Sequence, residues 1–394
     1  MTDTAEPLSE PMTIDVAAYI SPEYARAERD RLWRKVWQQV GRVEELPEVG
    51  SYLTHDILDD SIIVVRTAPG TGGESFTAHH NVCMHRGRRL IDVPEGAKQA
   101  AGRARKSFVC GFHGWTYGLD GACTHIRECD DWQGALTAAN THLAPVRVDT
   151  WGGWVWINMD PDAEPLADYL FPAAKILDPF GLENMRCKWR KWVHFDCNWK
   201  VAHDAFAEAY HVDTIHAGSF PNVFSTGLQN VKLMGPHRTC AVCLTLNAKP
   251  TPVSGIANGL AGASLVSMRG ESMLPPTINP DKRDDFAFEL SVLFPNTLLH
   301  ISEGIWFTHQ FWPIAHNRTL WEGRYYVKTP QTHGQRWATE HAMTLQRNAW
   351  LEDTATMEDT QRAMQSRAKL EQHLQDDEIL IRHGAVVVDR FVNA

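Results

Sequence analysis

The chain has 394 residues, of which 43% are hydrophobic and 22% are charged, as is ordinary for a globular protein of two or three domains. Its net charge of −10 argues against general nucleic-acid binding, which needs clustered lysine and arginine. No run of about eighteen apolar residues is present, so no membrane span is expected. The first residues are acidic and polar rather than a signal peptide, and we therefore expect a cytoplasmic protein.

The first 39 residues predict an extended arm followed by a helix, and we expect this region to pack with the C-terminal domain. Residues 1 to 20 have no clear periodicity. Ser21 and Pro22 are typical of a helix N-cap and first turn. The apolar positions that follow predict an amphipathic helix that ends near Gly41.

Residues 40–160 predict a small all-β domain. Short β-rich runs separated by turns occupy residues 52–54, 61–66, 108–110 and 154–157. A glycine-rich cluster at residues 69–73 predicts a turn. This cluster opens no helix and lacks the spacing of a nucleotide-binding loop.

Residues 161–394 predict a larger α+β domain after a linker rich in proline and acid. Alternating apolar and polar residues indicate half-buried strands at 189–195, within 238–247, and at 286–293, 298–301, 304–312 and 318–328. Residues 313–318 predict a hairpin connection. Helices are expected over 198–216 and through most of 332–378. Strands with helices segregated around them are typical of the α+β class.

Two cysteine–histidine pairs lie within the all-β part. Cys83 and His85 form the first pair, and Cys110 and His113 form the second. Two sulfurs and two imidazoles suit either a zinc ion or a two-iron cluster. The Cys-x-His spacing is too short for the usual zinc-finger loop, and an all-β domain favours a Rieske [2Fe–2S] centre, in which the cysteines bind one iron and the histidines the other.

A second candidate metal site lies between Asp204 and His216. His211 and His216 are five residues apart, and Glu208 precedes the first histidine by three. In a helix, Glu208 and His211 share one face, and His216 reaches the same ion if the helix ends or bulges there. Two imidazoles and one distant carboxylate form the facial triad of non-haem iron(II) oxygenases.

These motifs resemble the ring-hydroxylating, non-haem iron oxygenase family. The resemblance rests on Asn81–Gly87 with Cys110–Tyr117, and on Asn198–Lys200 followed by Tyr210, His211 and His216, and it extends from about Tyr24 to about Gln365. It implies a Rieske domain joined to a catalytic domain with a helix-grip-like curved antiparallel sheet. It also implies one [2Fe–2S] cluster and one mononuclear Fe(II) per subunit, and a trimer of catalytic subunits, alone or with a smaller second subunit.

The resemblance also implies the third ligand and an electron route. Asp353 matches the family's carboxylate ligand, and the adjacent Glu352 is its competitor. The family usually has aspartate three residues before the first histidine, where it bridges the Rieske histidine of one subunit to the iron histidine of its neighbour. Glu208 stands there instead, as in some oxygenases of quaternary ammonium compounds. The family's frequent Glu-Asn-Phe run is replaced by Asp204-Ala205-Phe206.

The expected function is therefore that of a terminal oxygenase, as in aromatic hydrocarbon catabolism. Dioxygen would hydroxylate or dihydroxylate an aromatic or hydrophobic substrate, with electrons from a separate reductase or ferredoxin, because the chain has no flavin or NAD fingerprint. Oxidative demethylation and quaternary-amine monooxygenation are alternatives within the superfamily. A pure Rieske electron-transfer protein and a zinc-binding module are alternatives of other classes.

Two further features have ordinary interpretations. The long segment between His85 and Cys110 predicts a surface loop whose basic residues, with Arg86, Arg88 and Arg89, are either solvated or a patch for an acidic electron donor. Cys240 and Cys243 have the CxxC spelling but lie in a strand-like run, so we expect them to pack in the core. The same is expected of Cys123, Cys129, Cys187 and Cys197.

Overall fold

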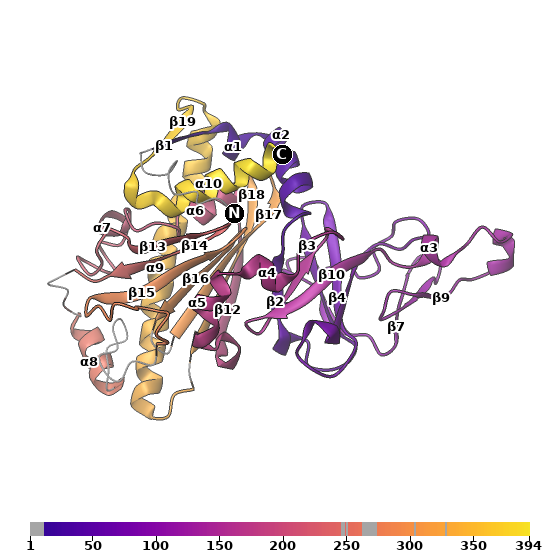
Figure 1. Ribbon diagram of the computed structural model, residues 1–394, viewed down its shortest axis with the longest axis horizontal. Coiled ribbons are helices and arrows are strands. Elements are labelled where there is room, and N and C mark those ends of the chain that lie inside the picture. The colour runs from indigo at the N-terminus through magenta and orange to yellow at the C-terminus, as the bar shows by residue number, and fades with distance from the viewer. Residues whose placement is uncertain (1–11, 246–248, 250, 262–273, 303–304, 328) are drawn as a thin grey trace. The chain divides into compact units, whose positions relative to one another are not determined.

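The computed structural model describes residues 12–394 except 246–248, 250, 262–273, 303–304 and 328. The described chain divides into two compact units, each built around a sheet of its own (Figure 1). The smaller unit is Trp33–Tyr169. The larger unit combines the residues up to Leu32 with Leu170–Ala394. Within the described residues, no helix has both the length and the apolar character needed to cross a membrane.

The smaller unit is made almost entirely of β-strands. Its seven-stranded sheet has the order β2-β11-β10-β5-β4-β3-β6, and β7-β8-β9 form a second sheet. The strands are β2 (Gln38–Arg42), β3 (Ser51–Ile57), β4 (Asp60–Arg66), β5 (Phe76–His80), β6 (Ala101–Arg103), β7 (Ser107–Val109), β8 (Thr116–Gly118), β9 (Cys123–His125), β10 (Pro145–Trp151) and β11 (Trp154–Asn158).

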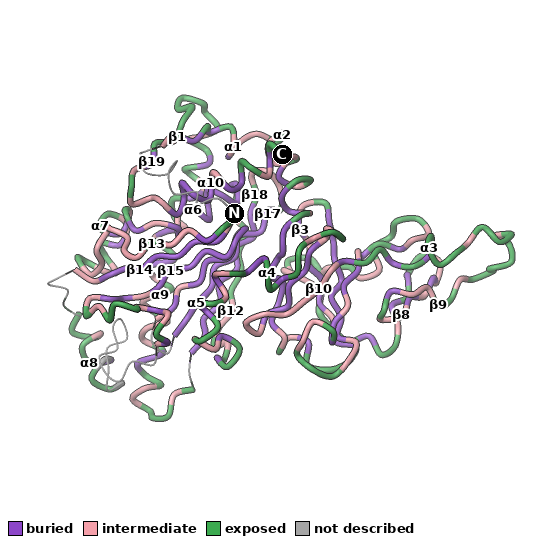
Figure 2. The backbone as a smooth tube through the Cα atoms, viewed as in Figure 1, coloured by how far each residue is buried: buried purple, intermediate pink, exposed green. Residues whose placement is uncertain are grey.

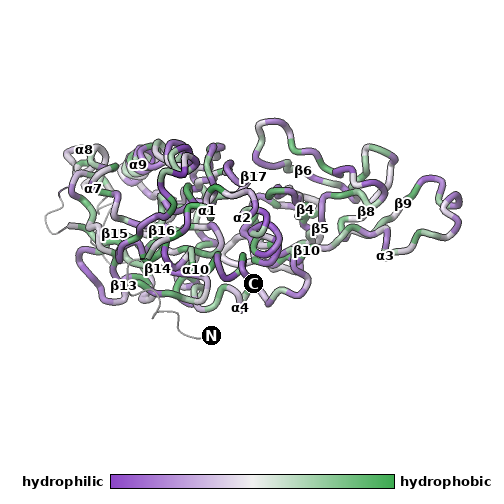
Figure 3. Tube along the Cα trace, turned by 90° about the horizontal axis from the view of Figure 1, so that it is seen from above, coloured by the Kyte–Doolittle hydropathy of each residue, from purple (hydrophilic) through white to green (hydrophobic). Residues whose placement is uncertain are grey.

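The interior strand β4 explains how this unit builds its core. All seven of its residues are buried, and its apolar run is visible in Figure 3. Because side chains alternate across a strand, Ile62 and Val64 pack in one cluster while Ile63 and Val65 pack in another, with Phe108. A third cluster contains Cys83 and Cys110 themselves, packed with Trp115, Tyr117 and Leu143.

The larger unit contains a seven-stranded antiparallel sheet with the order β12-β18-β17-β16-β15-β14-β13. Figure 2 shows that its central strands are largely buried. The strands are β12 (Arg186–Phe195), β13 (Gln229–Met234), β14 (His237–Cys243), β15 (Phe286–Leu293), β16 (Thr297–Ser302), β17 (Ile305–Ala315) and β18 (Arg318–Val327). Residues Pro313 to Arg318 form the predicted tight connection between β17 and β18.

Helices cover the face of this sheet that carries Phe307, His309 and Phe311. The longer ones are α8 (Pro252–Ala261), the 33-residue α9 (His333–Gln365) and α10 (Ile379–Val392), and the shorter ones are α6 (Trp199–Asp204) and α7 (Val212–Ile215). Trp350 of α9 contacts Phe307 and His309, and His203 of α6 contacts Phe311. This arrangement confirms the predicted class, an all-β domain joined to a helix-grip-like α+β domain.

The N-terminal elements include a strand that pairs with the C-terminal region. Strand β1 (Met12–Asp15) pairs with β19 (Glu371–Leu374), and α1 (Ala17–Ile20) precedes α2 (Pro22–Ala27). The Ser21 hydroxyl caps α2 by accepting hydrogen bonds from the backbone N–H groups of Glu23 and Tyr24, as predicted. Glu28, which begins the π-helical turn Glu28–Trp33, forms a buried ion pair of 2.5 Å with Lys200.

Three helix predictions need correction. The first helix ends at Trp33 rather than near Gly41, because Gln38–Arg42 join the sheet as β2. The expected helix over 198–216 is interrupted between Asp204 and Val212. The long C-terminal helix stops at Gln365, and residues 371–374 form β19 because they pair with β1.

Parts of three predicted strands (246–247, 304 and 328) and of the arm (1–11) lie outside the described residues. The predicted loop after His85 contributes β6, an exposed edge strand, to the smaller unit's sheet.

Candidate metal centres and the adjoining cavity

The two cysteine–histidine segments of the smaller unit fold into two matching loops. In each loop the cysteine N–H donates to the carbonyl five residues later, Arg88 or Trp115, at 2.8 Å. The residue four positions after each cysteine is Gly87 or Gly114, whose N–H donates to that cysteine's carbonyl. Both glycines have φ of +76°, a conformation that side chains other than glycine rarely adopt. The sequence therefore builds the same turn twice.

The four candidate ligands separate into a sulfur pair and an imidazole pair. Cys83 and Cys110 are buried, whereas the Nδ1 atoms of His85 and His113 face each other at 3.1 Å. Within the described parts of the chain, only His211, His216 and Asp353 bring three such ligand atoms within 4.8 Å of one another. The two cysteines and two histidines thus do not converge on one point, as a single zinc ion requires. They fit a cluster with one iron at the sulfurs and another at the imidazoles.

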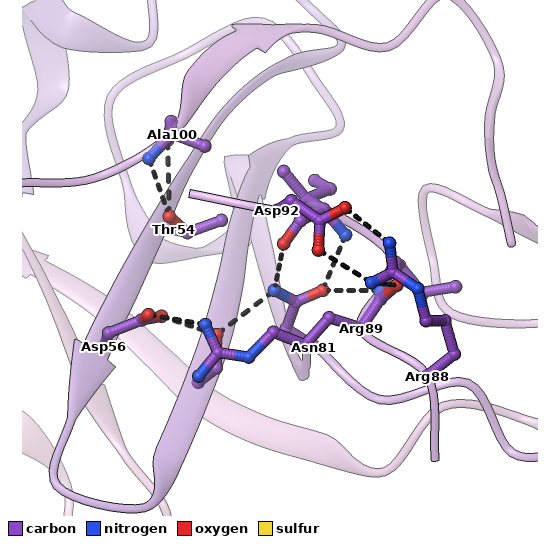
Figure 4. A network of polar contacts seen from close by, with 10 residues as sticks. Thr54, Asp56, Asn81, Arg88, Arg89, Asp92 and Ala100 are labelled. Carbon is purple, nitrogen blue, oxygen red and sulfur yellow. Dashed lines mark hydrogen bonds and ion pairs between the residues drawn. The ribbon is translucent and has the colours of Figure 1, made fainter. Parts of the chain in front are cut away.

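Asn81 fixes the start of the first loop. It is fully buried, and its Oδ1 accepts hydrogen bonds from the N–H groups of Leu90 and Ile91, both at 3.0 Å (Figure 4). Its Nδ2 donates to Ser61 Oγ at 3.1 Å and to the Ile91 carbonyl at 2.7 Å. The amide thereby ties the returning segment of the loop to the end of β5 and to β4.

Replacing Asn81 by alanine is expected to lower the free energy of unfolding by at least about 2 kcal/mol, because two buried backbone N–H groups lose their acceptor. Thermal denaturation should show this loss together with faster bleaching of the cluster's visible absorbance. Arg88→Ala serves as the control, since it removes only an exposed ion pair and should have little effect. Equal stability of the Asn81→Ala variant and the wild type would contradict the assigned role.

The arginines of this region are paired within the chain. Arg88 binds Asp92 at 2.5 Å, and Arg89 binds Asp56 at 2.7 Å (Figure 4). Arg86 lies over the ring of Phe112 at 5.4 Å. Because Asp92 and Asp56 balance two of the three charges, these side chains offer an acidic partner less positive charge than the sequence indicates.

In the larger unit, His211, His216 and Asp353 come together. The Nε2 atoms of the two histidines are 3.3 Å apart, and Asp353 Oδ1 lies 3.4 Å from the first and 3.0 Å from the second. Ligands at right angles around one ion, each about 2.1 Å from it, are separated by about 3 Å. The observed spacing therefore fits three adjacent ligands of one metal ion.

The interruption of the predicted helix brings the two histidines together. In a continuous helix, His216 would point about 140° away from His211. Instead, α6 ends at Asp204, and the two histidines flank the single turn α7, with ring centroids 5.1 Å apart. Phe206, within the interruption, stacks on His309 of β17 at 4.4 Å. This packing overrides the helix propensity of the alanine-rich segment.

Asp353 occupies a position of α9 that faces the core. The buried residues of this helix include Ala349, Trp350, Met357 and Gln361, and their spacing places Asp353 in the same stripe. Its carboxylate is 5% exposed, whereas that of the adjacent Glu352 is 28% exposed. The structure therefore places Asp353, and not its competitor Glu352, beside both Nε2 atoms.

Each histidine has a second carboxylate on its other ring nitrogen. Glu208 bonds His211 Nδ1, and its other oxygen accepts the His211 backbone N–H at 3.1 Å. Glu352 bonds His216 Nδ1 at 2.8 Å and accepts a hydrogen bond from Ser219 at 2.8 Å. Such partners fix the ring and leave the Nε2 lone pair for a metal. The resemblance did not assign this role to Glu352, although its place beside Asp353 was visible in the sequence.

The electrostatics of the triad favour a positive charge between the two Nε2 atoms and Asp353 Oδ1. Burial alone would lower the pKa of His211, but hydrogen bonds with Asp353 and Glu208 outweigh burial and raise that pKa to about 10. Burial would likewise raise the pKa of Asp353, but hydrogen bonds with the two histidines lower it. Asp353 Oδ1 is a buried acceptor without a well-formed hydrogen bond. Protons on the imidazoles, or a metal cation, would satisfy these atoms.

The triad forms part of the wall of a cavity of about 140 Å³ inside the larger unit. Seven aromatic side chains, from the segment around α7, the sheet and α9, also line the cavity. These are Phe206, Phe220, Phe224, Phe288, Phe307, Tyr325 and Trp350. Phe311 and Trp312 of β17 are fully buried and do not line it. The cavity therefore brings an apolar ligand next to the candidate metal site.

The remaining cysteines form no disulfide, and Cys197, Cys240 and Cys243 are buried as expected. Cys123 is partly exposed but packs against the cluster that contains Cys83 and Cys110, and Cys187 is also partly exposed. Cys129 is exposed, so the expectation of core packing was wrong for that residue. Asp204 lies away from the triad atoms, where it accepts a 2.7 Å hydrogen bond from the Tyr19 hydroxyl.

Comparisons with known proteins agree with both sites. A family model for the "Ring hydroxylating alpha subunit (catalytic domain)" matches residues 182–394, and a model for the "Rieske [2Fe-2S] domain" matches residues 36–142. The carnitine monooxygenase oxygenase subunit of Escherichia coli (strain K12) is 30% identical over 212 residues, covering 53% of each chain. The chain thus spans about half the length of this relative. The glycine betaine monooxygenase oxygenase subunit of Pseudomonas aeruginosa is 24% identical over 89% of this chain and 82% of its own.

Solved structures share the fold. Naphthalene 1,2-dioxygenase from Rhodococcus sp. superimposes with a TM-score of 0.75 at 19% identity, over 96% of this chain and 94% of its own. A quaternary ammonium Rieske monooxygenase in complex with L-carnitine gives 0.71 at 21% identity, over 96% and 95%. Together with the two family models, the paired loops and the triad place this chain in the family of ring-hydroxylating oxygenase alpha subunits, with a Rieske [2Fe–2S] domain before the catalytic domain.

Proposed function

We propose that the protein is the terminal oxygenase component of a multicomponent Rieske oxygenase, which uses dioxygen to hydroxylate an aromatic or otherwise hydrophobic substrate. The observation that carries this proposal is the position of His211, His216 and Asp353 in the wall of an aromatic cavity. A ferrous ion held by two imidazoles and one carboxylate keeps coordination positions open for dioxygen activation.

The residues of the chain prepare this chemistry in three ways. Glu208 and Glu352 hold the two ligand histidines with Nε2 directed at Asp353. The aromatic wall holds the substrate beside the ligands and excludes bulk water. In the smaller unit, Cys83, Cys110, His85 and His113 hold the [2Fe–2S] cluster that receives electrons.

Electrons come from a separate reductase or ferredoxin and pass to the catalytic site of a neighbouring subunit. Glu208 is the bridging carboxylate of this route, because it already binds His211 and can accept a further N–H bond from a Rieske histidine. The route requires an assembly of subunits, which we propose to be a homotrimer, with or without a smaller second subunit. The eight free cysteines suit a reducing compartment, and we place the enzyme in the cytoplasm.

A second candidate is the monooxygenation of a quaternary ammonium compound. Two observations favour it: glutamate stands at position 208, and relatives at about 30% identity are named for carnitine, choline or glycine betaine. The aromatic cavity wall would suit a cationic head group through cation–π contacts.

Metal analysis with oxygen uptake tests the proposal. The purified protein should be red-brown, with about three irons and two acid-labile sulfides per subunit. With a reductase, ring compounds such as naphthalene should stimulate oxygen uptake, and choline or L-carnitine should do so if the second candidate is right. About two irons and no stimulated uptake would leave an electron carrier, and zinc alone would exclude both oxygenase candidates.

Tyr117 provides a prediction for the electron-accepting centre. Its hydroxyl accepts a 3.1 Å hydrogen bond from Met84 N–H and lies 3.2 Å from Cys83 Sγ. Burial raises the pKa of Tyr117, so the hydroxyl stays protonated and can donate a hydrogen bond to the sulfur. Tyr117→Phe should therefore lower the reduction potential of the Rieske centre measured by redox titration, since hydrogen bonds to sulfur stabilise its reduced form. An unchanged or higher potential would contradict this hydrogen bond.

A further inference from the structure

His300 is a polar side chain held rigidly in the aromatic wall of the cavity. It lies on β16, directly opposite Leu290 of β15 and Phe307 of β17. Its imidazole stacks on Phe307 at 4.4 Å and on Phe288 at 5.2 Å between ring centroids. This sandwich fixes the plane of the ring, so a ligand must adapt to the ring rather than move it.

The hydrogen-bonding capacity of this ring is unused within the described chain. Nε2 of His300 is fully buried and has no hydrogen-bond partner. Since the ring itself forms part of the cavity wall, a molecule bound in the cavity can supply the missing hydrogen-bond partner. Burial lowers the pKa of His300 to about 3, and Asp353 offsets this only in part. The ring is therefore neutral at physiological pH, with one donor and one acceptor nitrogen.

Several other polar groups line the cavity. Glu208 bonds His211, and Ser254 lies 3.1 Å from His341 Nε2. Ser302, Tyr325 and Gln346 also belong to the wall, but unlike His300 they are not stacked between two aromatic rings. No lysine or arginine is found among the described residues that line the cavity. Burial also lowers the pKa of His341. Positive charge in the described cavity wall is therefore confined to the triad, and a substrate carboxylate placed beside His300 would meet no lysine or arginine.

We propose that His300 is a specificity-determining residue, which hydrogen-bonds a polar substituent on a flat, uncharged aromatic substrate. This inference rests on the proposed oxygenase function and narrows its substrate class. A hydroxyl substituent suits either tautomer of the imidazole, because it both donates and accepts. Zwitterions such as carnitine do not meet these requirements at His300, since no lysine or arginine of the described wall balances their carboxylate there.

Equilibrium dialysis of the iron-loaded protein without reductase tests this inference, because binding is then measured without turnover. The probes are naphthalene, 1-naphthol, 1-naphthoate, choline and L-carnitine. The wild type should bind 1-naphthol about tenfold more tightly than naphthalene, as one added hydrogen bond allows. It should bind 1-naphthoate and L-carnitine more weakly than 1-naphthol.

His300→Phe retains a ring between Phe288 and Phe307 but has no hydrogen-bonding group, and His300→Leu provides a smaller replacement if phenylalanine disturbs folding. Either folded variant should lose the preference for 1-naphthol while still binding naphthalene. The control His373→Phe makes the same change at an exposed position of β19 and should keep the preference.

Two results would overturn the inference: an undiminished preference in the folded His300 variants, or tighter binding of choline or L-carnitine than of 1-naphthol by the wild type. Failure of the proposed oxygenase function would appear separately, as missing iron at the triad or missing substrate-dependent oxygen uptake.

Discussion

Replacing Asp353 by alanine is expected to empty the mononuclear site and to reduce substrate-coupled oxygen uptake by at least about a hundredfold. Losing a carboxylate that merely supports a ligand already costs 10- to 100-fold in metal affinity or activity, and losing the ligand itself costs more. Asp353 is the one carboxylate within 3.4 Å of both Nε2 atoms among the described residues. The measured iron content should fall from about three to about two ions per subunit. The visible and EPR spectra of the Rieske centre should stay unchanged.

Glu352→Ala is the matched control for this experiment, because it removes the neighbouring acid of the same helix. Glu352 touches His216 only through Nδ1 and holds Ser219 with its other oxygen. The variant should keep its third iron at saturating metal and lose activity by about 10- to 100-fold. If Glu352→Ala lost the iron and Asp353→Ala kept it, the ligand assignment would have to be reversed.

The parts of the site that the sequence predicts are those in which local spacing determines the chemistry. Cys83 with His85, and Cys110 with His113, each lie within one tight turn, so their meeting requires no knowledge of distant packing. The strands were predicted well for the same reason. The period-2 pattern of residues 286–293 predicts a strand, and β15 has those bounds, although nearly all of its residues are buried rather than half of them.

The parts that the sequence did not predict depend on contacts between distant elements. Helix propensity favours an unbroken helix over 198–216, but the packing of Phe206 on β17 interrupts it. The strand β19 forms by pairing with β1, from Met12 with Leu374 to Asp15 with Glu371, so the partner lies at the opposite end of the chain. The C-terminal helix α10 lay beyond the predicted elements, although the helical spacing of its apolar residues was a usable signal.

His300 illustrates a further limit. The chain has 19 histidines, and His300 lies in an apolar, strand-like run. A histidine in such a run is ordinarily a core residue. Only the strand pairing shows that it stands between Phe288 and Phe307 on the face that carries the cavity. By contrast, the stripe formed by Ala349, Trp350 and Met357 would have favoured Asp353 over Glu352 without any family resemblance.

Replacing Glu208 by glutamine is expected to slow electron delivery to the catalytic site by more than tenfold while leaving both metal centres loaded. The amide oxygen can still accept a hydrogen bond from His211, so the ligand ring keeps its position. The lost negative charge weakens the second bond, to the Rieske histidine of the neighbouring subunit, on which the proposed route depends. The measurement is the rate at which the reduced Rieske centre is oxidised in a single turnover with substrate and dioxygen.

Glu352→Gln isolates the bridging role, because it makes the same chemical change on the other ligand histidine. Both glutamates bond the Nδ1 atom of a ligand histidine, so any loss of basicity at the triad should be similar in the two variants. Only Glu208 is proposed to contact the neighbouring subunit, and the rate should therefore fall much further in Glu208→Gln. Equal rates in the two variants would mean that Glu208 only orients His211, and that electrons reach the triad by another path.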